Sequence, residues 1–243
     1  MPDHRMHRGP HPEDVVAFAQ SQLERLRAAA SDFSWLLSRG YAQPSGIKLV
    51  GDRYQLTERQ RLAVLRCACA DEALERRRQH EVYSLNIVGN TLCIDGFNAI
   101  TTVEAALSGG LILQGRDGCF RDMASIHGHF KLVSETEPAV ELIGKVLAQL
   151  QPSHVVWYLD RPVSNSGRLA ELIRTHAAAH EWNWTVELVQ NPDPGLAQSE
   201  EIIATADSAI LDRCKQWFNL ARMVAQERVP GAWIVKLDPA VEG

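Results

Sequence analysis

Short apolar runs and longer helical patterns alternate through the second half of the chain. Runs rich in Val, Ile and aromatic residues predict strands near residues 91–95, 111–114, 154–159, 184–189, 201–206 and 232–237. Apolar residues at helical spacing predict helices near residues 102–108, 136–150, 168–180 and 208–225. Because this alternation is typical of parallel sheets covered by helices, residues 81–243 are predicted to form a three-layer α/β domain with a mainly parallel sheet.

The first third of the chain carries helical patterns with little sign of strands between them. Residues 1–11 are polar, and we expect them to form a disordered tail. Residues 12–80 are predicted to form a small helical N-terminal domain. It would begin at Pro12-Glu13-Asp14, where a proline and acidic residues favour a helix start.

Two further helices are predicted within this domain. The first is short, at about residues 33–38, and residues 41–56 after it are expected to be irregular or weakly extended. Thr57-Glu58-Arg59-Gln60 matches a capping box, so a second helix is predicted from there to about Gln79. Its exposed face would carry the run Arg76-Arg77-Arg78, which would either contact phosphate or form an ordinary solvated surface.

Composition narrows the class of protein. With 243 residues, 45% hydrophobic and 23% charged, the chain is long and apolar enough for a soluble protein with a sizeable core. It has no apolar run of membrane-spanning length and no signal-peptide pattern at its polar N-terminus, so a cytoplasmic location without membrane partners is expected. The five cysteines are odd in number and irregularly spaced, and are predicted to be buried free thiols.

Three aspartates stand where three apolar runs end, and they are the strongest indication of function. Asp95, Asp160 and Asp207 follow the runs at 91–94, 154–159 and 201–206. Because the carboxyl ends of parallel strands meet at one edge of a sheet, these carboxylates are predicted to converge there. Close carboxylates repel unless a cation or proton compensates, and Mg²⁺ or Mn²⁺ is the simplest compensation. An aspartate at a strand end is also a common turn residue, and Asp207 is equally well placed as a helix N-cap.

Other polar residues near these strand ends are candidates for the same site. Glu104 and Asp122 are possible further metal ligands. The Ser-Asn-Ser-Gly loop after Asp160 leads into a helix, a natural anion site, although Ser166 there would also serve as a plain helix cap. The candidate substrate-binding residues are Asn98, Arg116, Arg121, Arg161, Ser164, Asn165, Ser166, Arg168 and Ser208.

These motifs resemble a known group of sequences. The segments 94–98, 116–122, 159–168 and 204–212 resemble an uncharacterised prokaryotic protein family, and residues 32–66 resemble its N-terminal part, a domain of unknown function. The C-terminal part resembles PIN-like domains, a superfamily of metal-dependent ribonucleases. That resemblance implies that Asp95, Asp160 and Asp207 are catalytic metal ligands. It also implies a fourth acid, for which Glu104 and Asp122 are both candidates.

The expected function is therefore metal-dependent hydrolysis of phosphodiester bonds in RNA, with Mg²⁺ or Mn²⁺ as cofactor. Two alternatives stay open: an RNA- or nucleotide-binding module that has lost catalysis on the same fold, and a metal-dependent phosphatase. No Gly-x-Gly-x-x-Gly motif follows a predicted strand, which argues against a dinucleotide-dependent enzyme. The sequence does not indicate an oligomeric state.

Overall fold

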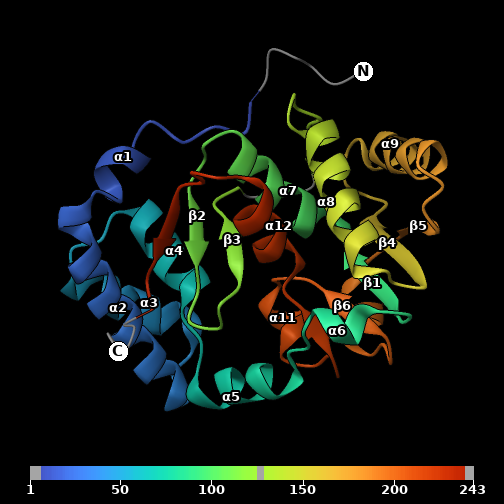
Figure 1. The fold of residues 1–243 in the computed structure, drawn as a ribbon. Helices are drawn as coiled ribbons and strands as arrows, with labels where there is room; N and C mark the ends of the chain where they lie inside the picture. The colour runs from blue at the N-terminus through green and yellow to red at the C-terminus, as the bar shows by residue number, and fades with distance from the viewer. Residues whose placement is uncertain (1–6, 125–128, 239–243) are drawn as a thin grey trace.

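The computed structural model describes residues 7–124 and 129–238, and it joins a helical N-terminal region to an α/β body (Figure 1). The helical region contains α1 (Asp14–Ala17), α2 (Gln20–Ser38), α3 (Gln43–Arg53), α4 (Glu58–Cys67) and α5 (Asp71–His80). The helices of the remaining chain are α6 (Ser84–Ile87), α7 (Gly96–Leu107), α8 (Thr136–Leu150), α9 (Ser166–Ala179), α10 (Asp193–Ala197), α11 (Ser208–Leu211) and α12 (Leu220–Arg228). Its strands are β1 (Thr91–Asp95), β2 (Ile112–Gln114), β3 (Phe120–Asp122), β4 (His154–Asp160), β5 (Trp184–Val189), β6 (Ile202–Ala204), β7 (Trp217–Phe218) and β8 (Ile234–Lys236).

The main sheet is fully parallel, with strand order β5-β4-β1-β6-β7. Alternate residues of β1 face opposite sides, as a pleated strand requires. Leu92 and Ile94 pack into the core beneath α7, α8, α9 and α12, whereas Cys93 packs with residues of α10 and α11. Helices therefore cover both faces of the sheet, which confirms the predicted α/β architecture.

A second, smaller sheet joins the two parts of the chain. Its order is β3-β2-β8, with β2 antiparallel to β3 and parallel to β8. Leu113 of β2 and Val235 of β8 belong to the same hydrophobic core as Phe18, Leu26 and Phe33 of the helical region. The predicted strands near 111–114 and 232–237 thus exist, but they lie outside the main sheet, because an apolar run does not specify its pairing partner.

The helical region differs from the prediction in two of its helices. The expected short helix at 33–38 is the end of the long helix α2. Residues 41–56, expected to be irregular, contain helix α3, because Ile47 and Val50 are one helical turn apart and pack in the core of this region. Gly46 allows that close packing, since a Cβ there would meet the ring of Phe33 at 3.0 Å.

The capping box at Thr57 is confirmed, but the helix that it begins is shorter than predicted. Helix α4 ends at Cys67, and a new helix begins at Asp71. Arg116 fixes this break, because its backbone N–H donates to the Cys67 carbonyl at 2.8 Å and its side chain donates to the Cys69 carbonyl at 3.0 Å. Partners so distant in sequence leave no local signal.

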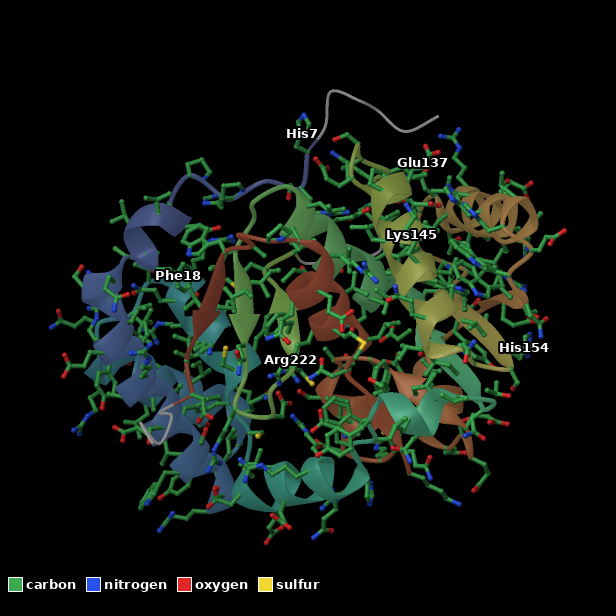
Figure 2. All side chains as sticks on the ribbon, viewed as in Figure 1. His7, Phe18, Glu137, Lys145, His154 and Arg222 are labelled. Carbon is green, nitrogen blue, oxygen red and sulfur yellow. The ribbon has the colours of Figure 1, made fainter. Side chains whose placement is uncertain are left out.

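Two other expectations concern the chain ends. The helix predicted at 208–225 is interrupted by β7, because the turn after α11 returns the chain to the main sheet. Of the tail expected to be disordered, residues 7–11 are described. The side chain of His7 (Figure 2) lies 2.7 Å from Glu135, and Arg8 contacts Glu104 at 2.8 Å. Residues 1–6 lie outside the described part of the chain.

Two compositional predictions can also be compared with the structure. The cysteines at 67, 69, 93, 119 and 214 are all buried and free, as expected. Among the described helices, none combines the length and apolar character that crossing a membrane would require.

Candidate functional site

A cleft of about 680 Å³ opens at the carboxyl edge of the main sheet. The aspartates among its lining residues are Asp95, Asp122, Asp160, Asp193, Asp207 and Asp212. The three strand-end aspartates singled out in the sequence therefore border one cavity. Arg66 and Arg121 are the arginines among the described lining residues, so negative charge is in clear excess.

Asp95 is a buried member of this acidic set. It ends β1 and is only 9% exposed, and its Oδ2 accepts a hydrogen bond from the Thr205 hydroxyl at 2.8 Å. Burial, with a smaller contribution from the charges of Asp207 and Asp193, raises the pKa of Asp95 to about 7, although the hydrogen bond from Thr205 opposes the shift. Gly96 permits the tight turn from β1 into α7, because a Cβ there would lie 2.6 Å from the Leu159 side chain.

Asp160 ends β4 and Asp207 follows β6, the two strands on either side of β1, and both residues border the same cleft. Burial raises the pKa of Asp160, and the nearby charge of Asp193 adds to that effect. Asp207 caps α11, and the cap uses Oδ1 alone, which accepts from the backbone N–H of Ala209 at 2.7 Å and that of Ile210 at 3.4 Å. The capping role predicted as an alternative for Asp207 is thus present, and it leaves the second carboxylate oxygen outside the cap.

Asp193 is a cleft residue that the sequence reasoning missed. It is the first residue of α10, and burial together with the charge of Asp207 raises its pKa. A signal was available, because Asn191-Pro192-Asp193 follows the apolar run at 184–189 and combines a proline with an acid at a helix start. Asp193 therefore extends the pattern of acids that follow parallel strands.

The two candidates for a fourth acid have different places. Asp122 borders the cleft, and its Oδ2 accepts hydrogen bonds from Thr101 and Thr102 at 2.9 and 3.2 Å. Glu104 lies outside the cleft lining and is fully buried, with Arg8 at 2.8 Å and the Thr136 hydroxyl at 2.5 Å. Burial raises the pKa of Glu104 to about 7 even though Arg8 opposes the shift.

Two of the arginines expected to bind substrate, Arg116 and Arg121, are engaged in contacts within the protein. Arg121 borders the cleft, but its guanidinium makes two hydrogen bonds to Asp117, at 2.9 and 2.7 Å, and donates to the Ala206 carbonyl. Arg116 does not line the cleft; it pairs with Asp71 at 2.7 Å besides fixing the break before α5.

The loop after Asp160 is also occupied by structural contacts, and none of its candidate residues from Arg161 to Arg168 lines the cleft. Ser164 and Asn165 donate to the backbone carbonyl of Phe130, at 3.2 and 2.7 Å. The Ser166 hydroxyl donates to the carbonyl of Arg161 at 3.0 Å, so it closes a turn. The structure therefore does not bring this predicted anion-binding loop into the acidic cleft.

Asn98 and Ser208 do border the cleft. The side-chain oxygen of Asn98 accepts from the backbone N–H of Ala206 at 2.8 Å, which ties the start of α7 to the chain after β6. His127, which with His129 could serve proton transfer or have no special role on the sequence alone, falls outside the described residues.

The prediction that Arg76, Arg77 and Arg78 lie on an exposed helix face is wrong for Arg77. Arg77 is 3% exposed and lies between Asp117, at 2.5 Å, and Asp212, at 2.7 Å. The helix packs this side chain inward because the two carboxylates, which are far away in sequence, compensate its buried charge. Arg76 and Arg78 are exposed, so only part of the run is available to a phosphate.

Comparisons with known proteins place the chain in a family. Residues 84–223 match a family described as "Domain of unknown function (DUF5616)", and residues 25–80 match one described as "Protein of unknown function (DUF434)". The chain is 31% identical over 186 residues to "Uncharacterized protein MJ0935" of Methanocaldococcus jannaschii, which covers 76% of this chain and 88% of that protein. No solved structure matches the chain. The resemblance predicted from the sequence motifs is thereby confirmed at the level of the family: the chain belongs to the DUF5616 family and carries a DUF434 region before it.

Proposed function

We propose that this protein is a metal-dependent nuclease that hydrolyses phosphodiester bonds in RNA, with its α/β body built as a PIN-like domain. The observation that carries the proposal is the convergence of Asp95, Asp160, Asp193 and Asp207 on one open cleft. These acids come from the ends of three adjacent strands and from the helix that follows a fourth. A cleft at the carboxyl edge of a parallel sheet is the usual location of a ligand site in such folds.

The acids of the cleft suit a hard divalent cation. Their donors are carboxylate oxygens, which Mg²⁺ and Mn²⁺ prefer. The raised pKa values of Asp95, Asp160 and Asp193 express unrelieved burial and repulsion, which a bound cation would relieve. Asp95, Asp160 and Asp207 would hold the ion, with Asp122 or Asp193 completing the set. When bound, the ion would supply charge that stabilises the reacting phosphate and the attacking water.

Charge distribution supports an anionic substrate that binds with the cation. A polyanion meets repulsion in a cleft with this excess of carboxylates, so it can approach the acids only where positive charge offsets them. Residues 1–80 contain 13 Lys and Arg against 10 Asp and Glu, whereas residues 81–243 contain 12 against 20. Arg66 of α4 brings the mildly basic region to the cleft wall, where it also donates to the Ala124 carbonyl at 2.8 Å. The helical region would thus contribute to holding RNA beside the acids.

The test is cleavage of single-stranded RNA by the purified protein with Mn²⁺, which EDTA should stop. Asp160→Asn should abolish cleavage and leave the fold intact, since the change removes a ligand charge but little volume. Asp193→Asn should reduce cleavage as well, because this carboxylate borders the same cleft. Asp52→Asn is the matched control, because Asp52 lies outside the cleft, is largely exposed and pairs with Arg61 at 2.8 Å.

Each outcome decides between the functions considered. Cleavage that survives Asp160→Asn would refute the proposed site and indicate another source of activity. Salt-sensitive RNA binding without metal-dependent cleavage would favour the inactive binding module. Release of phosphate from a phosphomonoester without cleavage of RNA would favour the phosphatase.

A further inference from the structure

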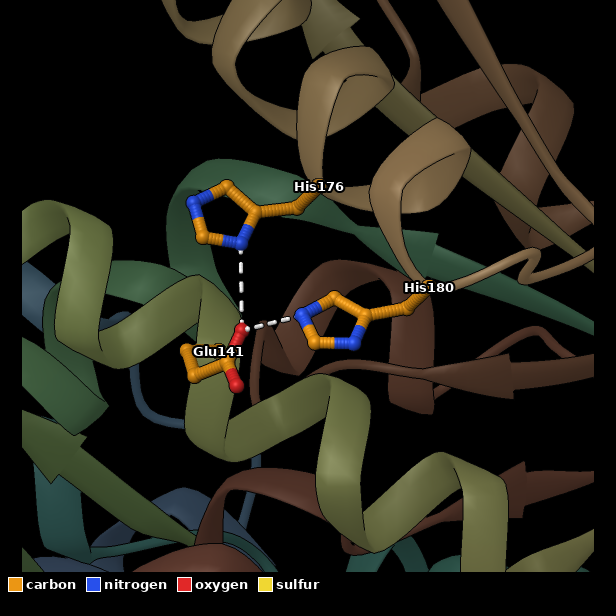
Figure 3. Close-up of side chains that lie close together, drawn as sticks. All are labelled: Glu141, His176 and His180. Atoms are coloured by element: carbon orange, nitrogen blue, oxygen red, sulfur yellow. Dashed lines mark hydrogen bonds and ion pairs between the residues drawn. The ribbon is translucent and has the colours of Figure 1, made fainter.

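Two imidazoles converge on one carboxylate where α8 packs against α9 (Figure 3), and none of these three side chains lines the acidic cleft. Glu141 Oε2 lies 3.1 Å from His176 Nδ1 and 3.0 Å from His180 Nε2. One potential ligand atom from each residue lies within 4.8 Å of the other two. The spacing His176-Ala-Ala-Ala-His180 places both rings on the same side of the last turn of α9.

These distances match what a small divalent cation requires. Ligand atoms at about 2.0–2.2 Å from a tetrahedral Zn²⁺ lie about 3.4 Å apart. Two of the distances in this cluster are already 3.0 and 3.1 Å, so a cation between the three atoms would need only a slight spreading of the side chains. The Glu141 carboxylate is 24% exposed and the His176 ring 14%, whereas the His180 ring is 41% exposed and is open to solvent.

The surroundings of the histidines also resemble those of metal ligands. Glu137 Oε1 lies 3.6 Å from His176 Nε2, so a carboxylate faces the ring nitrogen that would not hold the cation. Metal-bound histidines generally have such a partner, which fixes the ring orientation and strengthens the ligand. The carboxyl end of α9 adds its negative partial charge, which favours a cation there.

His180 is held in place by an aromatic ring that packs directly on α8. Its imidazole stacks on Trp182 with ring centroids 4.4 Å apart, and a Cβ at Gly144 would lie 2.0 Å from that indole. The ring can occupy this position only because residue 144 is a glycine. The histidine at the end of α9 is therefore kept beside Glu141 of α8.

We propose that Glu141, His176 and His180 form a second metal site, for a borderline divalent cation of the zinc class. Two nitrogens and one oxygen suit Zn²⁺, Co²⁺ or Ni²⁺, in contrast to the all-oxygen set of the acidic cleft. Three protein ligands leave a fourth position for water or for a further ligand. The cation would join α8 to α9 and replace Lys145, whose ammonium lies 3.2 Å from Glu141 (Figure 2).

The test is titration of the full chain with ZnCl₂ in buffer without Mg²⁺, measured by calorimetry. All of these titrations start from a parent variant with the substitutions His4→Gln, His7→Gln and His11→Gln, so that the N-terminal histidines cannot bind the metal. We expect one Zn²⁺ per chain at this site, and Glu141→Gln or His176→Gln should weaken its binding at least about 10-fold. Gln preserves size and hydrogen bonding, and circular dichroism with thermal unfolding verifies that each variant is folded.

Controls separate this site from other metal binding. His154→Gln should leave Zn²⁺ affinity unchanged, because that imidazole lies on β4 and contacts Thr185 at 2.7 Å (Figure 2). Asp160→Asn should also leave it unchanged, since the acidic cleft is a different site. Co²⁺ should quench part of the tryptophan fluorescence, and Trp182→Phe should reduce that response, because Trp182 stacks on His180 while Trp184 lies next to it. Equal Zn²⁺ affinity in the parent and in both Gln variants would overturn the proposal and leave the cluster as a carboxylate bound to two imidazoles.

Discussion

Replacing Asp95 by Asn should make the metal-free protein more stable at pH 8. Asp95 is buried among other acids, and its pKa rises from 3.8 in the unfolded chain to about 7 in the folded one. A carboxyl group with this difference costs the folded state about 4 kcal/mol when it is ionised. Asn carries no charge and keeps an oxygen that can accept the Thr205 hydrogen bond, so the gain should approach that upper limit.

The sign of the pH dependence provides a sharper test than the magnitude. Because the folded-state pKa is the higher one, this carboxyl group lowers stability progressively as pH rises from about 4 to about 7, and its cost is constant above that range. The advantage of Asp95→Asn should therefore shrink by about 3 kcal/mol between pH 8 and pH 5, where the folded wild type keeps the proton. Other titrating groups are common to both proteins and cancel in the difference.

Urea unfolding of both proteins in EDTA at the two pH values measures this difference. Mg²⁺ added at pH 8 should then stabilise the wild type and stabilise Asp95→Asn less, since an ion that binds only the folded state raises stability by mass action. The control Asp52→Asn should gain no comparable stability at pH 8, and Mg²⁺ should stabilise it as much as it stabilises the wild type. A variant that is less stable than the wild type at pH 8, or a difference that is the same at both pH values, would refute this account of Asp95.

Two further substitutions test how the fold is held together. Asp117→Asn should lower the free energy of unfolding by about 3–5 kcal/mol, because it leaves the buried guanidinium groups of Arg77 and Arg121 without their common partner. Urea unfolding measures this loss, and a loss below about 1 kcal/mol would contradict the assignment. Gly144→Ala should lower the free energy of unfolding by about 1–3 kcal/mol or more, since the added methyl group must displace the Trp182 ring. Thermal unfolding measures this loss, and a neutral or stabilising effect would show that the contact is loose.

Much of the α/β body follows from periodicity in the sequence. Buried parallel strands are continuous apolar runs, so Asp95 and Asp160 could be placed at strand ends without a structure. The convergence of their carboxylates then followed from the geometry of any parallel sheet. Asp193 was missed because it stands four residues beyond its strand, where a loop rather than the strand determines its position.

The roles of the arginines could not be predicted in the same way. A run of three arginines on a helix predicts an exposed face unless the partner of each side chain is known. The partners of Arg77 lie 40 and 135 residues away in the sequence. Arg116 and Arg121 likewise contact carbonyls and carboxylates from distant segments. Such ion pairs depend on tertiary contacts, whereas local sequence carries only the charge.

The pairing of β8 with β2 has a consequence for how the protein forms in the cell. Val235 and Leu237 supply part of the core shared with α2 and α4, so these helices cannot complete their packing until β8 has been made. During synthesis, Phe33 and its apolar neighbours would remain exposed for many seconds at ordinary elongation rates. A chaperone would therefore protect the helical region while the chain is being made. Removal of β8 should disrupt the packing of the helical region rather than the acidic cleft.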